Sequence, residues 1–252
     1  MANILFSVRR LKKIFSNNFE ALSGIDLDII EGECLIIAGA NGSGKTLLMK
    51  ILSGLLEATE GTILYKGEAL SKCGNTIHSS VGLVFQEPEA QILGETVEED
   101  IRFGPENLKL GKKEIESRLE ETLKSLGLCE KRDFPVRHLS GGEKRRLAAA
   151  GVLAMGCKTI IMDEPFANLD WPGVVQVLSI IRFLKQSGRT IIILTHELEK
   201  VLAFADRLLV IAEGKIKDSG TPEEILERLD PAWGVRDPRK TYKSAGDCTW
   251  LE

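Results

Sequence analysis

Residues 39–46 read GANGSGKT, and this octet limits the possible folds of the chain more than any other segment. It has the form G-x-x-x-x-G-K-[ST], and it stands directly after the apolar run 34–38 and before the helical pattern 47–52. Glycines let the backbone turn successive N–H groups toward phosphate oxygens, and the following helix offers its positive end. The segment therefore predicts a strand–loop–helix unit that binds the phosphates of a nucleotide.

The two residues that close the octet have specific roles in such a loop. Lys45 supplies a cation for the β- and γ-phosphates, and the Thr46 hydroxyl is a ligand for Mg²⁺. The pattern predicts a bound nucleotide and Mg²⁺ as cofactors. We expect the nucleotide to contact Gly39, Ala40, Asn41, Gly42, Ser43, Gly44, Lys45, Thr46 and Leu47.

Short apolar runs recur along the chain at residues 81–85, 159–162, 190–194 and 208–212. Continuously apolar runs of this length are typical of strands buried on both faces of a parallel sheet. Helical patterns lie between them, for example at 174–186, and the alternation predicts an α/β fold. Residues 25–29 alternate between apolar and acidic, which predicts a half-buried strand, and the last apolar run should turn back as a hairpin.

Two stretches depart from this alternation. Residues 88–156 are rich in helical pattern without a convincing strand, which indicates a helical subdomain inserted into the α/β core. After about residue 230 the pattern fades into a polar segment with two prolines, which we expect to be loosely packed.

An acidic pair, Asp163–Glu164, ends the apolar run 159–162. Ligands of open α/β sheets bind at the carboxyl ends of the strands, which is where this pair falls. We expect Asp163 to help hold Mg²⁺, through water, and Glu164 to accept a proton from an attacking water. The alternative is that Asp163 only caps the following helix.

Composition excludes several other classes of protein. The 252 residues carry a net charge of −4, which gives no electrostatic reason to expect nucleic-acid binding. The five cysteines form no C-x-x-C pair, so they indicate buried thiols of a cytosolic protein rather than a disulfide or zinc framework. No apolar run reaches the roughly 18 residues that a membrane span needs, and the N-terminus is unlike a secretory signal.

Residues 139–143 read LSGGE, and their order between GANGSGKT and IIMDEP resembles the ATP-binding cassette (ABC) ATPases over about residues 4–230. The resemblance implies a P-loop NTPase fold: an ABC ATPase core (1–230) with an antiparallel β part, the helical subdomain at about 88–156, and a tail at 231–252. It also implies that the bound nucleotide is ATP, and that Ser140, Gly141 and Gly142 contact the γ-phosphate held by a second subunit. The local alternative is a capping box between Ser140 and Glu143 that begins a helix.

Four further positions match the family. By resemblance, Gln86 is the Q-loop glutamine, which contacts Mg²⁺ or water and senses a transmembrane partner, and His196 is the switch histidine that holds the γ-phosphate. Asp170 resembles the D-loop aspartate, which touches the opposite subunit, with helix capping as its alternative. Phe15 stands where the family has an aromatic residue that stacks on adenine, and Phe19 competes for that role. The implied catalytic set is Glu164, His196, Gln86 and Lys45, and the implied metal set is Thr46, Gln86 and Asp163.

The segment VFQEPEAQILGETVEEDIRFGPENLKL (84–110) resembles the ATPases of energy-coupling-factor importers, including the cobalt and nickel group. The resemblance implies a peripheral subunit on the cytoplasmic face of the membrane. Its partners would be integral membrane subunits, a substrate-capture subunit, and a second ABC ATPase in a homodimer or heterodimer, with cobalt, nickel or a vitamin such as biotin as cargo. Two alternatives stay open: a soluble ABC ATPase of DNA repair, translation or iron–sulfur assembly, and a catalytically silent binding module.

Overall fold

A central parallel sheet organises the computed structural model, which describes residues 3–239. Its six strands lie in the order β10-β9-β3-β8-β7-β6, and β9 and β10 form the expected antiparallel hairpin while the others run parallel. The carboxyl ends of β3, β8, β7 and β6 are therefore neighbours at one edge. The strand bounds are β3 (Cys34–Ala38), β6 (Val81–Val84), β7 (Thr159–Asp163), β8 (Thr190–Thr195), β9 (Arg207–Ala212) and β10 (Lys215–Gly220).

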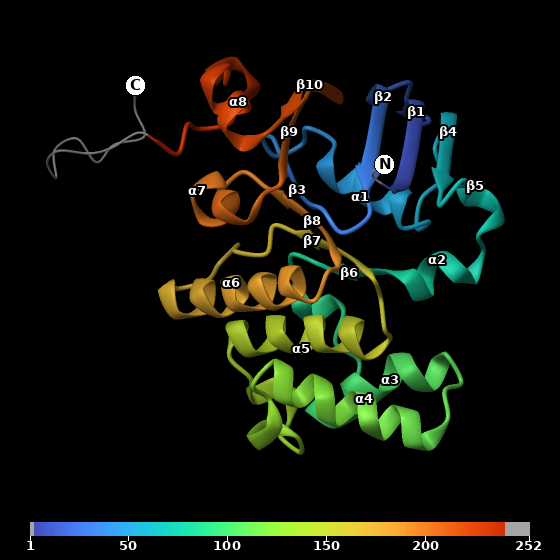
Figure 1. The fold of residues 1–252 in the computed structure, drawn as a ribbon, viewed down its shortest axis with the longest axis vertical. Helices are drawn as coiled ribbons and strands as arrows, with labels where there is room; N and C mark the ends of the chain where they lie inside the picture. The colour runs from blue at the N-terminus through green and yellow to red at the C-terminus, as the bar shows by residue number, and fades with distance from the viewer. Residues whose placement is uncertain (1–2, 240–252) are drawn as a thin grey trace, which may run out of the picture.

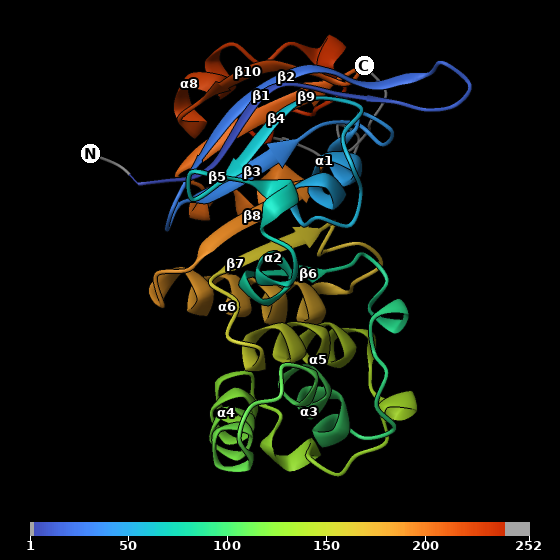
Figure 2. The ribbon, with the colours of Figure 1, turned by 90° about the vertical axis from the view of Figure 1, so that its right-hand side faces the viewer.

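A smaller antiparallel sheet covers one face of the central sheet, with helix α1 (Lys45–Leu52) between the two (Figures 1 and 2). Its strands lie in the order β2-β1-β4-β5. Apolar side chains of both sheets and of α1 form one buried cluster, which fixes the helix directly behind the phosphate loop. The strand bounds are β1 (Ile4–Ile14), β2 (Glu20–Ile30), β4 (Glu60–Tyr65) and β5 (Glu68–Ala69).

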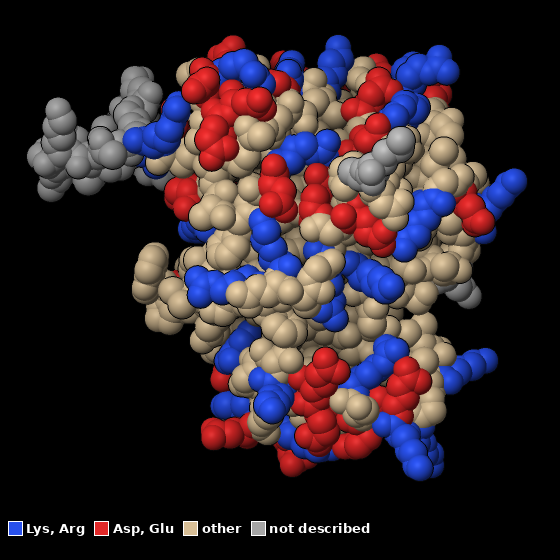
Figure 3. All heavy atoms as spheres, in the orientation of Figure 1, with Lys and Arg blue, Asp and Glu red and all other residues tan. Residues whose placement is uncertain are grey.

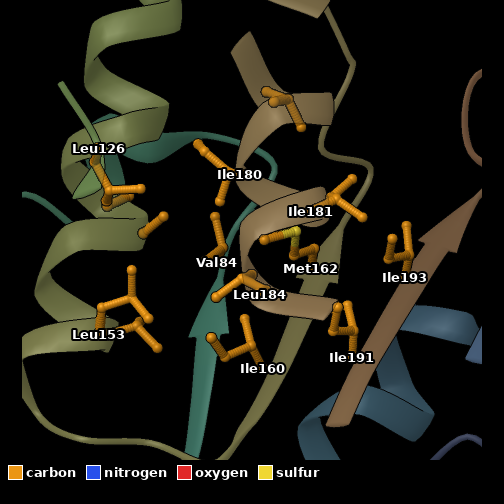
Figure 4. Packing of buried hydrophobic residues seen from close by; sticks show 14 of the residues in the cluster. Val84, Leu126, Leu153, Ile160, Met162, Ile180, Ile181, Leu184, Ile191 and Ile193 are labelled. Atoms are coloured by element: carbon orange, nitrogen blue, oxygen red, sulfur yellow. The ribbon is translucent and has the colours of Figure 1, made fainter. Parts of the chain in front are cut away.

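Helices α5 (Gly141–Ala154) and α6 (Trp171–Gln186) cover the other face. Alternate residues of each central strand point to opposite faces, so Ile191 joins the helical side while Ile192 joins the α1 side. Figure 4 shows side chains of β7 and β8, among them Met162 and Ile191, directed toward Ile181 and Leu184 of α6. Burial on both faces explains why these strands are continuously apolar in sequence.

The stretch expected to be helical lies farthest from the smaller sheet, at the lower end of Figure 2. Between residues 88 and 156, all of which are described, the structure has α3 (Val97–Asn107), α4 (Lys112–Ser125), α5 and short 3-10 turns, without a named strand. Arg132 joins Glu98, Glu116 and Glu120 in an ion-pair network across α3 and α4. On the face shown in Figure 3, charges of both signs are interspersed over this part.

Three short helices complete the fold: α2 (Asn75–Ser80), α7 (Leu198–Val201) and α8 (Pro222–Glu227). The expectation of a loose tail is wrong for residues 231–239, because Val235 is buried and Arg239 donates to the carbonyl oxygen of Leu226 (2.6 Å). The rest of that tail, 240–252, lies outside the described residues. Among residues 3–239, no helix combines the length and apolar character that crossing a bilayer requires.

Candidate nucleotide site

The phosphate loop connects β3 to α1, as the sequence predicts. Gly44 has a φ of 106°, a left-handed conformation that glycine adopts without strain, and it directly precedes the helix. A Cβ atom at Gly39 would lie 2.2 Å from the carbonyl oxygen of Ile211, so the close approach of β9 also requires glycine. These two positions leave the backbone N–H groups of the loop and the N-terminus of α1 facing one cavity.

The cavity has a volume of about 310 Å³. Residues 41–47 line it together with Phe19, Ala21, Gln86 and Glu164. Phe15 and Phe19 lie at the two ends of one turn, joined by a hydrogen bond from the Phe15 N–H to the Phe19 carbonyl oxygen (3.0 Å). Phe19 lines the cavity whereas Phe15 does not, so the geometry favours the second of the two aromatic candidates.

The Lys45 side chain is buried in this loop, with 5 % of its surface exposed. Its amino group donates to the carbonyl oxygens of Gly39 (2.6 Å) and Ala40 (3.1 Å), and it lies 3.5 Å from Oε1 of Glu164. Burial lowers the pKa of this amino group, and the nearby carboxylate partly opposes the change. A phosphate oxygen offers the same cation a charged acceptor in place of two carbonyl groups.

Thr46 and Asp163 meet where α1 approaches the end of β7. The Thr46 hydroxyl donates to Oδ2 of Asp163 (2.8 Å). Oδ1 of Asp163 is buried and accepts no hydrogen bond from any described residue, and burial raises the pKa of this carboxyl. A hydroxyl beside an unpartnered carboxylate oxygen fits Mg²⁺, which binds through one or two protein oxygens, water and substrate phosphates. Gln86, the third expected ligand, lines the same cavity.

Glu164 and His196 come from adjacent strands. His196 follows β8 directly, and its Nδ1 lies 3.0 Å from Oε2 of Glu164. The Glu164 side chain is 8 % exposed and that of His196 is 45 % exposed, so the histidine forms the solvent side of the pair. Glu164 has a φ of 43°, which is rare for a residue with a side chain. Its N–H donates to the Leu194 carbonyl oxygen (2.9 Å), so β8 helps to hold this conformation.

Residues 139–143, the LSGGE segment that we call the signature, lie apart from this cavity. Ser140 accepts the Glu143 N–H (3.2 Å), and the Glu143 carboxylate accepts the Ser140 N–H (2.8 Å), so a capping box begins α5. Asp170 likewise caps α6, through the N–H of Gly173 (2.9 Å). The local capping alternatives are therefore correct as geometry, and contact with a second subunit stays a prediction.

One buried residue near the site was not expected from sequence. Arg145 of α5 is 6 % exposed, and its Nη2 donates to the carbonyl oxygens of Gln86 (3.0 Å) and Ala167 (2.5 Å). The sequence pattern of α5 does not predict the burial of Arg145, because a lysine–arginine run after a capping box is typical of a solvated helix face.

Three features lie together at the carboxyl edge of one parallel sheet: a glycine-rich phosphate loop, a buried aspartate that accepts a hydrogen bond from the threonine of that loop, and a glutamate–histidine pair. Together they define a P-loop ATPase. The comparison with known families is more specific. The chain belongs to the ABC transporter family, whose model matches residues 22–167, and it is an ABC ATPase.

Relatives and solved structures agree with this assignment. A putative ABC transporter ATP-binding protein of Halobacterium salinarum is 40% identical over 93% of this chain and 100% of its own length. The energy-coupling factor transporter ATP-binding protein EcfA of Methanocaldococcus jannaschii is 41% identical, over 83% of this chain and 76% of its own. The structure of cbiO1 from Clostridium perfringens, described as part of the ABC transporter complex cbiONQ, superposes with a TM-score of 0.83 at 36% identity, covering 89% of this chain and 91% of that one.

Proposed function

We propose that this chain is the ATP-hydrolysing subunit of an energy-coupling-factor importer. The observation that carries the proposal is the convergence of Lys45, Thr46 and Glu164 on one cavity, with Asp163 bonded to the Thr46 hydroxyl. Similarity to EcfA and cbiO1 supports the type of importer. The cargo we propose is a cobalt or nickel ion or a vitamin such as biotin.

Each residue has a distinct task in the proposed hydrolysis. The amides of the phosphate loop and Lys45 orient the triphosphate, and Phe19 or Phe15 stacks on adenine. Thr46, Asp163 and Gln86 would hold Mg²⁺, which neutralises charge on the phosphates. Glu164 orients the attacking water and accepts its proton, while His196 holds Glu164 and the γ-phosphate.

The proposed enzyme works as a dimer. Ser140 and Gly141 are exposed at the start of α5, and neither they nor Asp170 line the cavity of their own chain. A second ABC ATPase, identical or homologous, would bring its own phosphate loop against them, so that two ATP molecules lie between the subunits. Closure on ATP and opening after hydrolysis would then drive transport.

A second cavity supports docking to a membrane subunit. It measures about 580 Å³ and lies beside the segment that follows Gln86, with Glu89, Ile92 and Lys144 among its lining residues. Leu93, next to Ile92, is 64% exposed. Apolar Ile92 and the ion pair of Glu89 and Lys144 (3.0 Å) line the cavity together, and such a mixed surface suits an amphipathic helix of an integral membrane partner. We propose that this contact, in a complex that also contains a substrate-capture subunit, holds the chain at the cytoplasmic face of the membrane.

Trapping the ATP-bound state tests the dimer. We expect Glu164→Gln to form ATP-dependent dimers by light scattering, because the amide keeps the shape of the site but accepts no proton. Omitting ATP is the matched control. If the variant binds ATP but stays monomeric with itself and with every co-expressed homologue, the dimer is refuted.

Membrane fractionation tests the docking surface. Leu93→Arg should move the chain from the membrane fraction to the supernatant, because a cation replaces an exposed apolar contact. Leu55→Arg is the control, since Leu55 is also exposed (53%) but, unlike Leu93, has no neighbour in the chain that lines this cavity. Equal behaviour of the two variants would contradict the proposed surface.

A further inference from the structure

Arg145 joins three segments that are far apart in sequence. It belongs to α5, whose first residues carry the signature, and its Nη2 reaches the carbonyl oxygens of Gln86 and Ala167. Ala167 lies between Glu164 and Asp170, and its N–H donates to the Glu164 carbonyl oxygen (3.1 Å). A single guanidinium therefore connects the signature helix, the segment after β6 and the loop after β7.

The backbone just before Gln86 is fixed from another side. The Gln91 side chain accepts the N–H of Phe85 (3.2 Å) and donates to the carbonyl oxygen of Leu83 (2.8 Å), so it closes the edge of β6. The segment 83–85 is thereby tied to Gln91, and the bond from Arg145 ties the next residue, Gln86, to the helical subdomain.

Burying the Arg145 guanidinium against neutral carbonyl groups costs desolvation free energy that no buried carboxylate among the described residues offsets. Burial lowers the pKa of Arg145, and its Nε has no hydrogen-bond partner within residues 3–239. The nearby carboxylate of Glu89 is paired with Lys144 instead. An apolar side chain in its place would leave the carbonyl oxygens of Gln86 and Ala167 without this donor, so the particular contribution of this residue is the connection between those two segments.

We propose that Arg145 is a positioning residue for ATP hydrolysis: it sets the backbone of Gln86 relative to the loop that carries Glu164 and Asp170. A displacement of α5 then moves both segments together. Since Lys144, the neighbouring residue, lines the cavity proposed for the membrane partner, occupation of that cavity changes the geometry at Gln86 through Arg145. The proposal rests on the function proposed above for Gln86 and for the loop after β7.

Steady-state ATP hydrolysis by the full chain tests the assignment. We expect Arg145→Met to lower kcat by about 10- to 100-fold, the range of a misplaced catalytic group, while KM for ATP changes by less than about threefold because the phosphate loop is untouched. Arg145→Lys keeps a donor and should recover part of kcat. The matched control is Arg118→Met, which removes a bond from a guanidinium to a carbonyl at the far end of α5 (Ala154, 2.9 Å) and should leave kcat unchanged.

A double-mutant cycle with Gln86→Ala identifies the route. If Arg145 acts through Gln86, Arg145→Met reduces kcat less in the Gln86→Ala background than in the natural chain. An equal loss in both backgrounds overturns the proposal, and so does a kcat of Arg145→Met, per folded molecule, within about twofold of the natural chain. If Arg145→Met does not fold, the same comparisons apply to Arg145→Lys. A natural chain that hydrolyses no ATP would refute the proposed function itself, which is a different result.

Discussion

Replacing Ser140 with alanine removes a helix cap and, in the proposed dimer, a hydroxyl that meets the γ-phosphate of the partner. The loss of the cap can be estimated from the structure. Ser140 and Glu143 form a reciprocal capping box, and the removal of such a serine costs about 1 kcal/mol. For a chain of this size, that lowers Tm by roughly 2–4 °C.

A matched capping box at another helix isolates this part of the effect. Thr221 and Glu224 cap α8 with the same pair of hydrogen bonds, and neither lines the nucleotide cavity. Thr221→Ala should therefore lower Tm by a similar amount without changing ATP hydrolysis. Ser140→Ala should also lower kcat, by about 10- to 150-fold, because a hydrogen bond to a charged group contributes about 1.5–3 kcal/mol.

A third variant separates the two roles within Ser140 itself. Aspartate is as good a helix cap as serine, so Ser140→Asp should keep Tm close to that of the natural chain. Its carboxylate repels a γ-phosphate, so hydrolysis should be lost. Thermal unfolding and steady-state hydrolysis on the three variants decide the matter: a fully active Ser140→Asp, or equal kcat for Ser140→Ala and Thr221→Ala, would show that Ser140 is only a cap.

Three further predictions concern the site and the core behind it. Because burial raises the pKa of Asp163, this carboxyl favours folding below its unfolded pKa of about 3.9, and that contribution is lost as pH rises through its higher folded pKa. Asp163→Asn should therefore raise Tm at pH 7 without nucleotide, lose this advantage in acid and abolish Mg²⁺-dependent hydrolysis; a lower Tm at pH 7 would contradict the argument. A Cβ at Gly82 would lie 2.0 Å from Val152, so Gly82→Ala should destabilise the fold by about 1–3 kcal/mol in urea unfolding, and Val152→Ala should restore part of the loss. Phe19→Ala should weaken ATP binding in calorimetry more than Phe15→Ala does, because Phe19 lines the cavity, and the opposite ranking would assign adenine stacking to Phe15.

Local chemistry made much of the site predictable. The phosphate loop and the pair Asp163–Glu164 follow strands buried on both faces, and such strands are apolar without interruption. Their expected bounds differ from the observed ones by at most one residue, as for β7 and β8. Parallel strands place their carboxyl ends at one edge, so the approach of Thr46 to Asp163 followed from the fold class.

Features that depend on contacts between distant segments were harder to predict from the sequence. Strand β1 lacks a regular alternation because its register shifts between Val8 and Leu11, next to Arg10, which has a φ of 48°; a bulge of this kind breaks the period of two on which strand prediction depends. The burial of Arg145 depends on carbonyl groups of two other segments. The same limit applies to Phe15 and Phe19, which share one turn and differ only in which ring faces the phosphate loop.

At Glu164, the left-handed backbone favours a residue different from the one that the proposed chemistry requires. Glycine accepts that conformation freely, whereas a residue with a side chain is strained there by on the order of 1 kcal/mol. A substitution of Glu164 by glycine would therefore stabilise the fold but remove the proposed base. An inactive variant that keeps the native backbone is therefore better made with glutamine than with glycine, since only glutamine retains the backbone strain at position 164.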